Sequence, residues 1–176
     1  DNSNAKRYYN QLLLDYPTHA RAVDAIFQLG AIAFSAEEFS QSESHFLRIV
    51  NEHPNSSRYQ ESLESLKRVY TAMGKPEKYE ALLNSLGVQL SQSEQDELLF
   101  DPALLAYEKG NYSEAIKLFE NYFAKVSNPS KDLEALYCLG TSYLKTGNRE
   151  SCIVNYKKIL AKPTNMYTET AALEVS

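Results

Sequence analysis

The chain has 176 residues, of which 43% are hydrophobic and 23% are charged, and it contains two cysteines. Its 18 basic and 23 acidic residues give a net charge of −5, so the chain lacks the excess of positive charge that is typical of nucleic-acid-binding proteins. No stretch of the sequence approaches the roughly 18 apolar residues of a membrane-spanning helix, so we expect no insertion into a membrane.

The apolar pattern and the turn residues predict a succession of helices along the whole chain. They are expected at 3–16, 19–35, 38–52, 57–73, 76–86, 93–108, 112–126, 130–146, 149–161 and 166–175. Pro102 lies inside one of them, where we expect the helix to kink or to restart near Asp101. The Ser- and Gln-rich stretch 87–97 is predicted to be a flexible joint, a long turn within one solenoid.

Every second helix repeats the same apolar face at a period of about 37 residues. The first column of this face is Ala5, Ser42, Tyr79, Ala115 and Cys152. Four residues later stand Tyr9, Phe46, Leu83, Phe119 and Tyr156, and three residues after those stand Leu12, Ile49, Leu86, Tyr122 and Ile159. Because positions 0, 4 and 7 lie on one side of a helix, and because each unit contains two helices, the repeat predicts an all-α fold, an α–α superhelix of antiparallel helix pairs.

The first helix of two pairs contains a glycine in its interior, at Gly30 and Gly140. Glycine there costs about 1 kcal/mol relative to alanine, so each needs a packing reason. We expect the second helix of the pair to approach closely at Ser42 and at Cys152. The two cysteines are not expected to form a disulfide.

These columns resemble the tetratricopeptide repeat family. Residues 133–166 carry the family pattern at Leu136, Leu139, Gly140, Tyr143, Cys152, Tyr156 and Ile159. The resemblance implies one tetratricopeptide-like solenoid over residues 1–176, with a degenerate third stretch. Its units are expected at about 1–22 (partial), 23–59, 60–95, 96–132, 133–169 and 170–176 (partial).

Two segments, 9–17 and 46–54, also resemble short sequence motifs found in repeat proteins of the bacterial cell envelope, including those of the Bacteroides group. This finer resemblance favours a periplasmic or outer-membrane-associated location over a cytoplasmic one. The first helix does not provide the polar cap that normally ends a solenoid. We therefore expect the natural protein to continue at one end at least, and self-association through uncapped ends remains open.

The family resemblance also indicates where a partner would bind. In tetratricopeptide proteins the concave face is lined by first-helix side chains that lie off the packing columns. Here those positions include Phe27, Phe34, Arg68, Phe100, Leu104, Tyr107 and Tyr137. An apolar face with one arginine suits a protein or peptide partner, such as an amphipathic helix laid in a groove, or the next turn of a longer superhelix.

The sequence contains no glycine-rich phosphate loop, no metal-ligand pair at helical spacing and no catalytic set of Ser, His and Asp. We therefore expect a noncatalytic protein–protein interaction scaffold without cofactor or metal. The alternative is an architectural segment of a larger cell-envelope assembly protein that has no ligand of its own.

Overall fold

The computed structural model describes residues 2–19 and 21–176, and within them every regular element is a helix. The helices are α1 (Asn2–Asp15), α2 (Ala22–Ser35), α3 (Phe39–Glu52), α4 (Tyr59–Ala72), α5 (Pro76–Ser85), α6 (Gln92–Glu108), α7 (Tyr112–Lys125), α8 (Asp132–Lys145), α9 (Arg149–Leu160) and α10 (Thr168–Val175). The all-α prediction is confirmed, and the helices lie close to their expected bounds.

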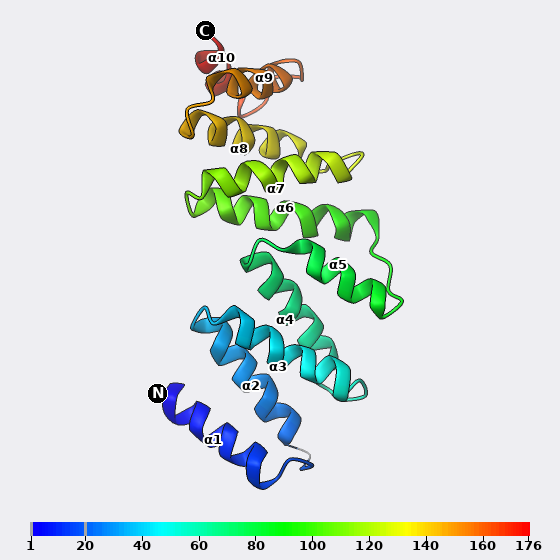
Figure 1. The fold of residues 1–176 in the computed structure, drawn as a ribbon. Coiled ribbons are helices and arrows are strands. Elements are labelled where there is room, and N and C mark those ends of the chain that lie inside the picture. The colour runs from blue at the N-terminus through cyan, green and yellow to red at the C-terminus, as the bar shows by residue number, and fades with distance from the viewer. Residues whose placement is uncertain (1, 20) are drawn as a thin grey trace. The chain divides into compact units, whose positions relative to one another are not determined.

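The chain forms two compact units, residues 1–73 with α1 to α4 and residues 74–176 with α5 to α10. Within each unit, helices that follow one another in sequence pack side by side, and α2 with α3, α6 with α7 and α8 with α9 make the most extensive contacts (Figure 1). This sequential antiparallel pairing is consistent with an α–α superhelix.

The repeated apolar columns form the interior, as the sequence predicts. In α3, α7 and α9 every column residue is at most 2% exposed. They are Ser42, Phe46, Ile49, Ala115, Phe119, Tyr122, Cys152, Tyr156 and Ile159. The matching residues of α1, which are Ala5, Tyr9 and Leu12, are only half-buried.

The glycines of α2 and α8 make room for a ring from the next helix. A Cβ added at Gly30 would lie 2.8 Å from Phe46 Cε1, and one at Gly140 would lie 2.7 Å from Tyr156 Cε1. The Ser42 hydroxyl also donates a hydrogen bond of 2.9 Å to the Gly30 carbonyl. The expected close approach is confirmed, but the side chains that need the space are Phe46 and Tyr156, one turn beyond Ser42 and Cys152.

Two expectations about α6 need correction. The helix begins at Gln92, because Ser91 and Glu94 form a capping box, so only the first part of the predicted joint 87–97 lies outside helices. The helix also continues through Pro102, which is fully buried, and so does not restart at Asp101, while the expected kink stays a prediction. Burial of the proline ring offsets the hydrogen bond that proline cannot donate.

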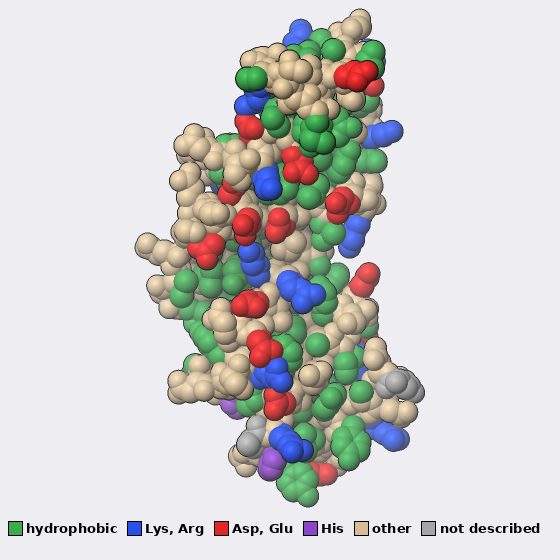
Figure 2. All heavy atoms as spheres, turned by 180° about the vertical axis from the view of Figure 1, so that it is seen from behind, with side chains coloured by type: hydrophobic (Ala, Val, Ile, Leu, Met, Phe, Trp, Pro, Cys, Tyr) green, Lys and Arg blue, Asp and Glu red, His purple; other side chains and the backbone are tan. Residues whose placement is uncertain are grey.

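Acidic and basic side chains are interspersed on the face drawn in Figure 2, with hydrophobic side chains between them and no broad patch of one sign. Within the described part of the chain, no helix is both long enough and apolar enough to cross a membrane.

Candidate functional site

A cavity of about 220 Å³ opens on unit 1 beside α2, α3 and α4. Its lining residues are Phe27, Ala31, Phe34, Ser35, Phe46, Ser65 and Arg68. We call it the α2–α4 cavity. Because positions three and four apart share one side of a helix, Phe27, Ala31 and Phe34 line it together from α2. Ser65 and Arg68 are three residues apart on α4, so they also lie on one side of their helix. Phe46 reaches the cavity from the core column of α3.

The aromatic walls of the cavity are held by contacts within unit 1. The Phe27 ring lies 5.3 Å from the Phe46 ring, and the Phe34 ring lies 5.7 Å from the Phe39 ring, both tilted. Such ring pairs contribute about 0.5–1.5 kcal/mol beyond the area they bury. The cavity is therefore a preformed feature of the packed helices.

A guanidinium group lies over each of two cavity-wall rings. Arg58 Cζ is 4.9 Å from the centre of the Phe27 ring, and Arg68 Cζ is 5.1 Å from the centre of the Phe34 ring. A cation in this position is attracted to the negative face of the ring.

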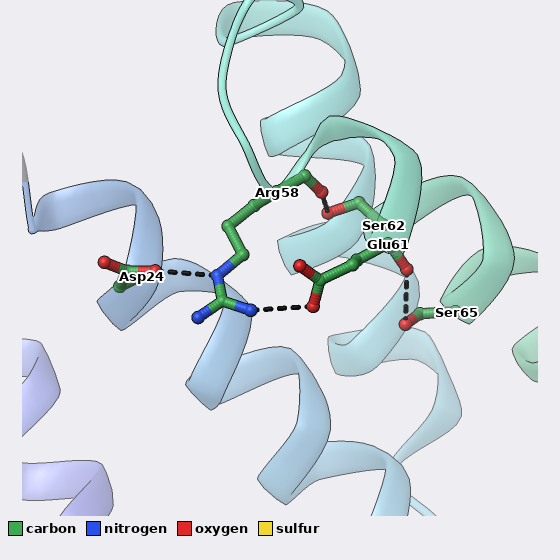
Figure 3. A network of polar contacts seen from close by, with 5 residues as sticks. All are labelled: Asp24, Arg58, Glu61, Ser62 and Ser65. Atoms are coloured by element: carbon green, nitrogen blue, oxygen red, sulfur yellow. Dashed lines mark hydrogen bonds and ion pairs between the residues drawn. The ribbon is translucent and has the colours of Figure 1, made fainter.

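The two arginines differ in their polar partners. Arg58 Nε donates to Asp24 of α2 at 2.7 Å, and another Arg58 nitrogen donates to Glu61 of α4 at 2.7 Å (Figure 3). These hydrogen bonds raise the pKa of Arg58 and join the start of α4 to α2. Arg58 is thus neutralised by its own unit.

Arg68 has no such partner. Within residues 2–19 and 21–176 it forms no ion pair, and its side chain is exposed. Its contact with the Phe34 ring face uses none of its N–H groups as hydrogen-bond donors. The N–H groups of Arg68 therefore remain available at the edge of the cavity.

The two serine hydroxyls of the cavity already use their protons. Ser35 Oγ donates to the Ala31 carbonyl at 3.1 Å, and Ser65 Oγ donates to the Glu61 carbonyl at 2.8 Å. Each hydroxyl oxygen keeps its capacity to accept a hydrogen bond. The cavity thus combines apolar walls, two acceptor hydroxyls and one available cation.

The structure brings Phe27, Phe34 and Arg68 together, as the sequence predicts, but it places Phe100 in the core. Phe100 is 3% exposed and packs against Phe119 and Tyr122, with ring centres 6.0 Å and 5.6 Å apart. Its assignment to an open binding face is wrong. Tyr122 stands where α3 and α9 carry an isoleucine, and its ring is one of two that pack against Phe100.

The predicted site residues of unit 2 also take part in packing. Leu104, Tyr107 and Tyr137 are half-buried against the hydrophobic core. The Tyr107 ring lies 5.9 Å from the Tyr112 ring, and the Tyr137 ring is stacked with those of Tyr156, at 6.2 Å, and Tyr167, at 4.6 Å. Whether these three residues contact a partner stays a prediction.

These ring pairs show a packing rule that the sequence reasoning missed. The aromatic residue of the first helix packs on that of the second in the pairs Phe27–Phe46, Phe100–Phe119 and Tyr137–Tyr156. The common sequence offset of 19 residues between partners was the available signal. The roles of Ser35 and Ser65 were also missed, although Ser65 lies three residues before Arg68 on the same helix.

Both cysteines, Cys138 and Cys152, are free and buried. Burial raises the pKa of the Cys138 thiol to about 12, and burial also raises the pKa of the Cys152 thiol. The thiolate is the reactive form of cysteine, and a raised pKa keeps both groups protonated as thiols. Both cysteines therefore act as small apolar side chains in the core.

Exposed apolar side chains of α1 and of the residue that follows it form a second surface feature. Tyr8, Leu14 and Tyr16 are 77%, 76% and 60% exposed. Self-association through this helix is not tested by the structure and stays a prediction.

No protein-family model matches the chain, and no curated protein matches it at a significant level of similarity. What the fold defines is an all-helical, repeat-like protein whose helices pack in adjacent pairs.

Proposed function

We propose that this chain is a noncatalytic scaffold of the tetratricopeptide type that binds a segment of another protein. The binding face is formed in unit 1 by α2 and α4, each the first helix of an expected pair, and such first helices line the concave surface in that family. The observation that carries the proposal is the α2–α4 cavity, where Phe27, Phe34 and Arg68 meet around space that the core does not fill.

Packing energetics support this assignment. The buried columns of α3, α7 and α9 account for the stability of the helix pairs, whereas Arg68 is exposed and adds little to folding. An apolar hollow beside an available guanidinium has the composition of a binding hot spot, in which aromatic and Arg side chains dominate the energy.

A specific observation favours the architectural alternative in unit 2. There the Tyr137 ring is half-buried and stacks with the rings of Tyr156 and Tyr167, so part of the predicted face is occupied by the chain itself. We therefore place the partner-binding role on unit 1 and propose that unit 2 is mainly architectural.

The test is to fill the cavity without disturbing the core. Ala31 lines the cavity, so Ala31→Leu places an isobutyl group in it while keeping a strong helix former. Ala124→Leu, at an exposed position of α7, is the matched control. Affinity capture from cells that produce the protein, read by quantitative mass spectrometry, compares the two variants with the natural sequence.

We expect a defined protein to be retained by the natural sequence and by Ala124→Leu but lost with Ala31→Leu, with helical content unchanged. Equal retention by all three proteins contradicts a binding role for the cavity. Capture of nothing by the natural sequence supports the architectural alternative.

A further inference from the structure

We infer that the segment bound at the α2–α4 cavity carries a large apolar side chain with an aspartate or glutamate within one helical turn of it. This inference rests on the proposed function and specifies the chemistry of the partner.

The size of the cavity sets the first part of the motif. Pockets that hold drug-sized molecules measure roughly 300–1,000 Å³, and this cavity measures about 220 Å³. It has the room for one large side chain. Its walls include the rings of Phe27, Phe34 and Phe46, so the group that enters it is apolar.

The charge at the edge sets the second part. Among the described side chains that line the cavity, Arg68 is the one that carries a charge. Arg58, the other guanidinium on a cavity-wall ring, is bound by Asp24 and Glu61, whereas Arg68 lies over the Phe34 ring and forms no ion pair with the described residues. An acidic side chain of the partner would form with Arg68 the kind of ion pair that Asp24 and Glu61 form with Arg58.

The hydroxyl groups agree with this assignment. Because Ser35 and Ser65 donate their protons to backbone carbonyls, neither is placed to donate to an anion. A carboxylate bound here is directed to Arg68, where hydrogen bonds between ionised groups are roughly twice as strong as neutral ones. The distance from Arg68 to the apolar walls is short, since its guanidinium lies over Phe34, and this limits the acidic residue to about one turn from the apolar one.

The probe is a library of random peptides displayed on phage and selected on the complete chain. We expect selected sequences to pair Phe, Leu, Ile or Met with Asp or Glu within four positions. A synthetic peptide of this kind should bind Arg68→Glu at least about tenfold more weakly than the natural sequence. Changing the acidic residue of the peptide to lysine should restore binding to Arg68→Glu.

Arg149→Glu, an exposed arginine of α9 with the same change in charge, is the matched control and should bind the acidic peptide normally. Arg68→Gln serves if Arg68→Glu loses helical content, and it should also weaken binding. Peptides that are blocked by Ala31→Leu but indifferent to the charge at position 68 overturn this inference and leave the proposed function standing. Peptides that bind Ala31→Leu unchanged, or a failure to select any, overturn both.

Discussion

The turn within each helix pair needs one residue in the left-handed region of backbone space. Two packed pairs, α6–α7 and α8–α9, place glycine there, at Gly110 and Gly147, with φ of 74° and 84°. Gly74, just before α5, has the same conformation, with φ of 65°. The equivalent residue between α2 and α3 is Glu37, with φ of 58°. A side chain in this conformation costs about 1–2 kcal/mol, so Glu37 is a strained position in an otherwise regular repeat.

Glu37→Gly should therefore stabilise unit 1. The relief of strain exceeds the extra entropy that glycine gives the unfolded chain, which leaves a gain of about 0.5–1 kcal/mol in the free energy of unfolding. Gly110→Ala is the reciprocal variant, because no atom lies within 4 Å of the added Cβ and only the backbone is strained. Urea unfolding should show the first variant stabilised and the second destabilised; a shift of both in one direction would show that φ does not govern these positions.

Gly30 is required for a different reason, the contact of its backbone with the Phe46 ring. We expect Gly30→Ala to lower the free energy of unfolding by about 1 kcal/mol or more, because overpacking costs about 1–3 kcal/mol and outweighs the helix propensity of alanine. In a Phe46→Leu background the same change should become neutral or stabilising. A double-mutant cycle measured by denaturation checks this coupling, and additive effects would contradict it.

At the scale of the elements, a buried carboxylate joins α6, α7 and the start of α8. Asp96 of α6 is 5% exposed and accepts a hydrogen bond from the Tyr122 hydroxyl of α7. It also accepts one of 2.8 Å from the Ser130 backbone N–H in the turn before α8. Burial raises the pKa of Asp96, but the hydrogen bonds from Ser130 and Tyr122 together lower it by more than burial raises it. The pKa of Asp96 therefore lies below its ordinary value.

Asp96→Asn should lower the free energy of unfolding at neutral pH by about 1.5–3 kcal/mol, the usual contribution of hydrogen bonds to a charged group. Because the folded pKa is depressed, this stabilisation is present above the unfolded pKa of about 3.9 and is lost as the pH falls through the folded pKa. The difference between the natural sequence and the variant should therefore shrink below pH of about 4. Exposed Asp15→Asn should have little effect at any pH; a difference for Asp96→Asn that grows with acidity would contradict the assigned sign.

The helices were predictable because proline and glycine mark their ends. Tyr16-Pro17 and His53-Pro54 follow α1 and α3 directly, and the left-handed glycines stand just before α5, α7 and α9. The start of α6 is not marked by a proline or a left-handed glycine directly before it. Its signal is the capping box of Ser91 and Glu94, which the sequence contains but which lies within the Ser- and Gln-rich stretch 87–97.

At the scale of the whole molecule, the division between units falls after Met73, inside the degenerate repeat expected at 60–95. The short segment between α5 and α6 includes Gln89 and Leu90, whose amides make no backbone hydrogen bond within the described residues. Residues 31–34 of α2 are helical and belong to a pair with a continuous buried core.

Amides at 89 and 90 should therefore exchange with solvent much faster than amides at 31–34 in native-state hydrogen exchange. The physical reason is that exchange in α2 requires opening of the packed α2–α3 pair. Equal protection in the two segments would contradict the described difference in hydrogen bonding.

The site was less predictable than the fold. Helical spacing places Phe27 and Phe34 on one side of α2, so their meeting at one cavity could be predicted. The burial of Phe100 could not, because it depends on packing against Phe119 and Tyr122 of the next helix. The stacking of Tyr137 depends on Tyr167, which lies 30 residues later in the chain. Residue type and period alone do not say which of two equivalent faces another side chain will cover.

The central claim is that the α2–α4 cavity is where a partner protein contacts this chain. The most direct measurement is photo-crosslinking from a photoreactive amino acid placed at Ser35, an exposed residue at the cavity, with Ala124 as the control position. We predict a crosslinked adduct with one protein from position 35, lost when Ala31→Leu fills the cavity, and none from position 124. An adduct from position 35 that persists with Ala31→Leu, or equal adducts from both positions, would contradict the account.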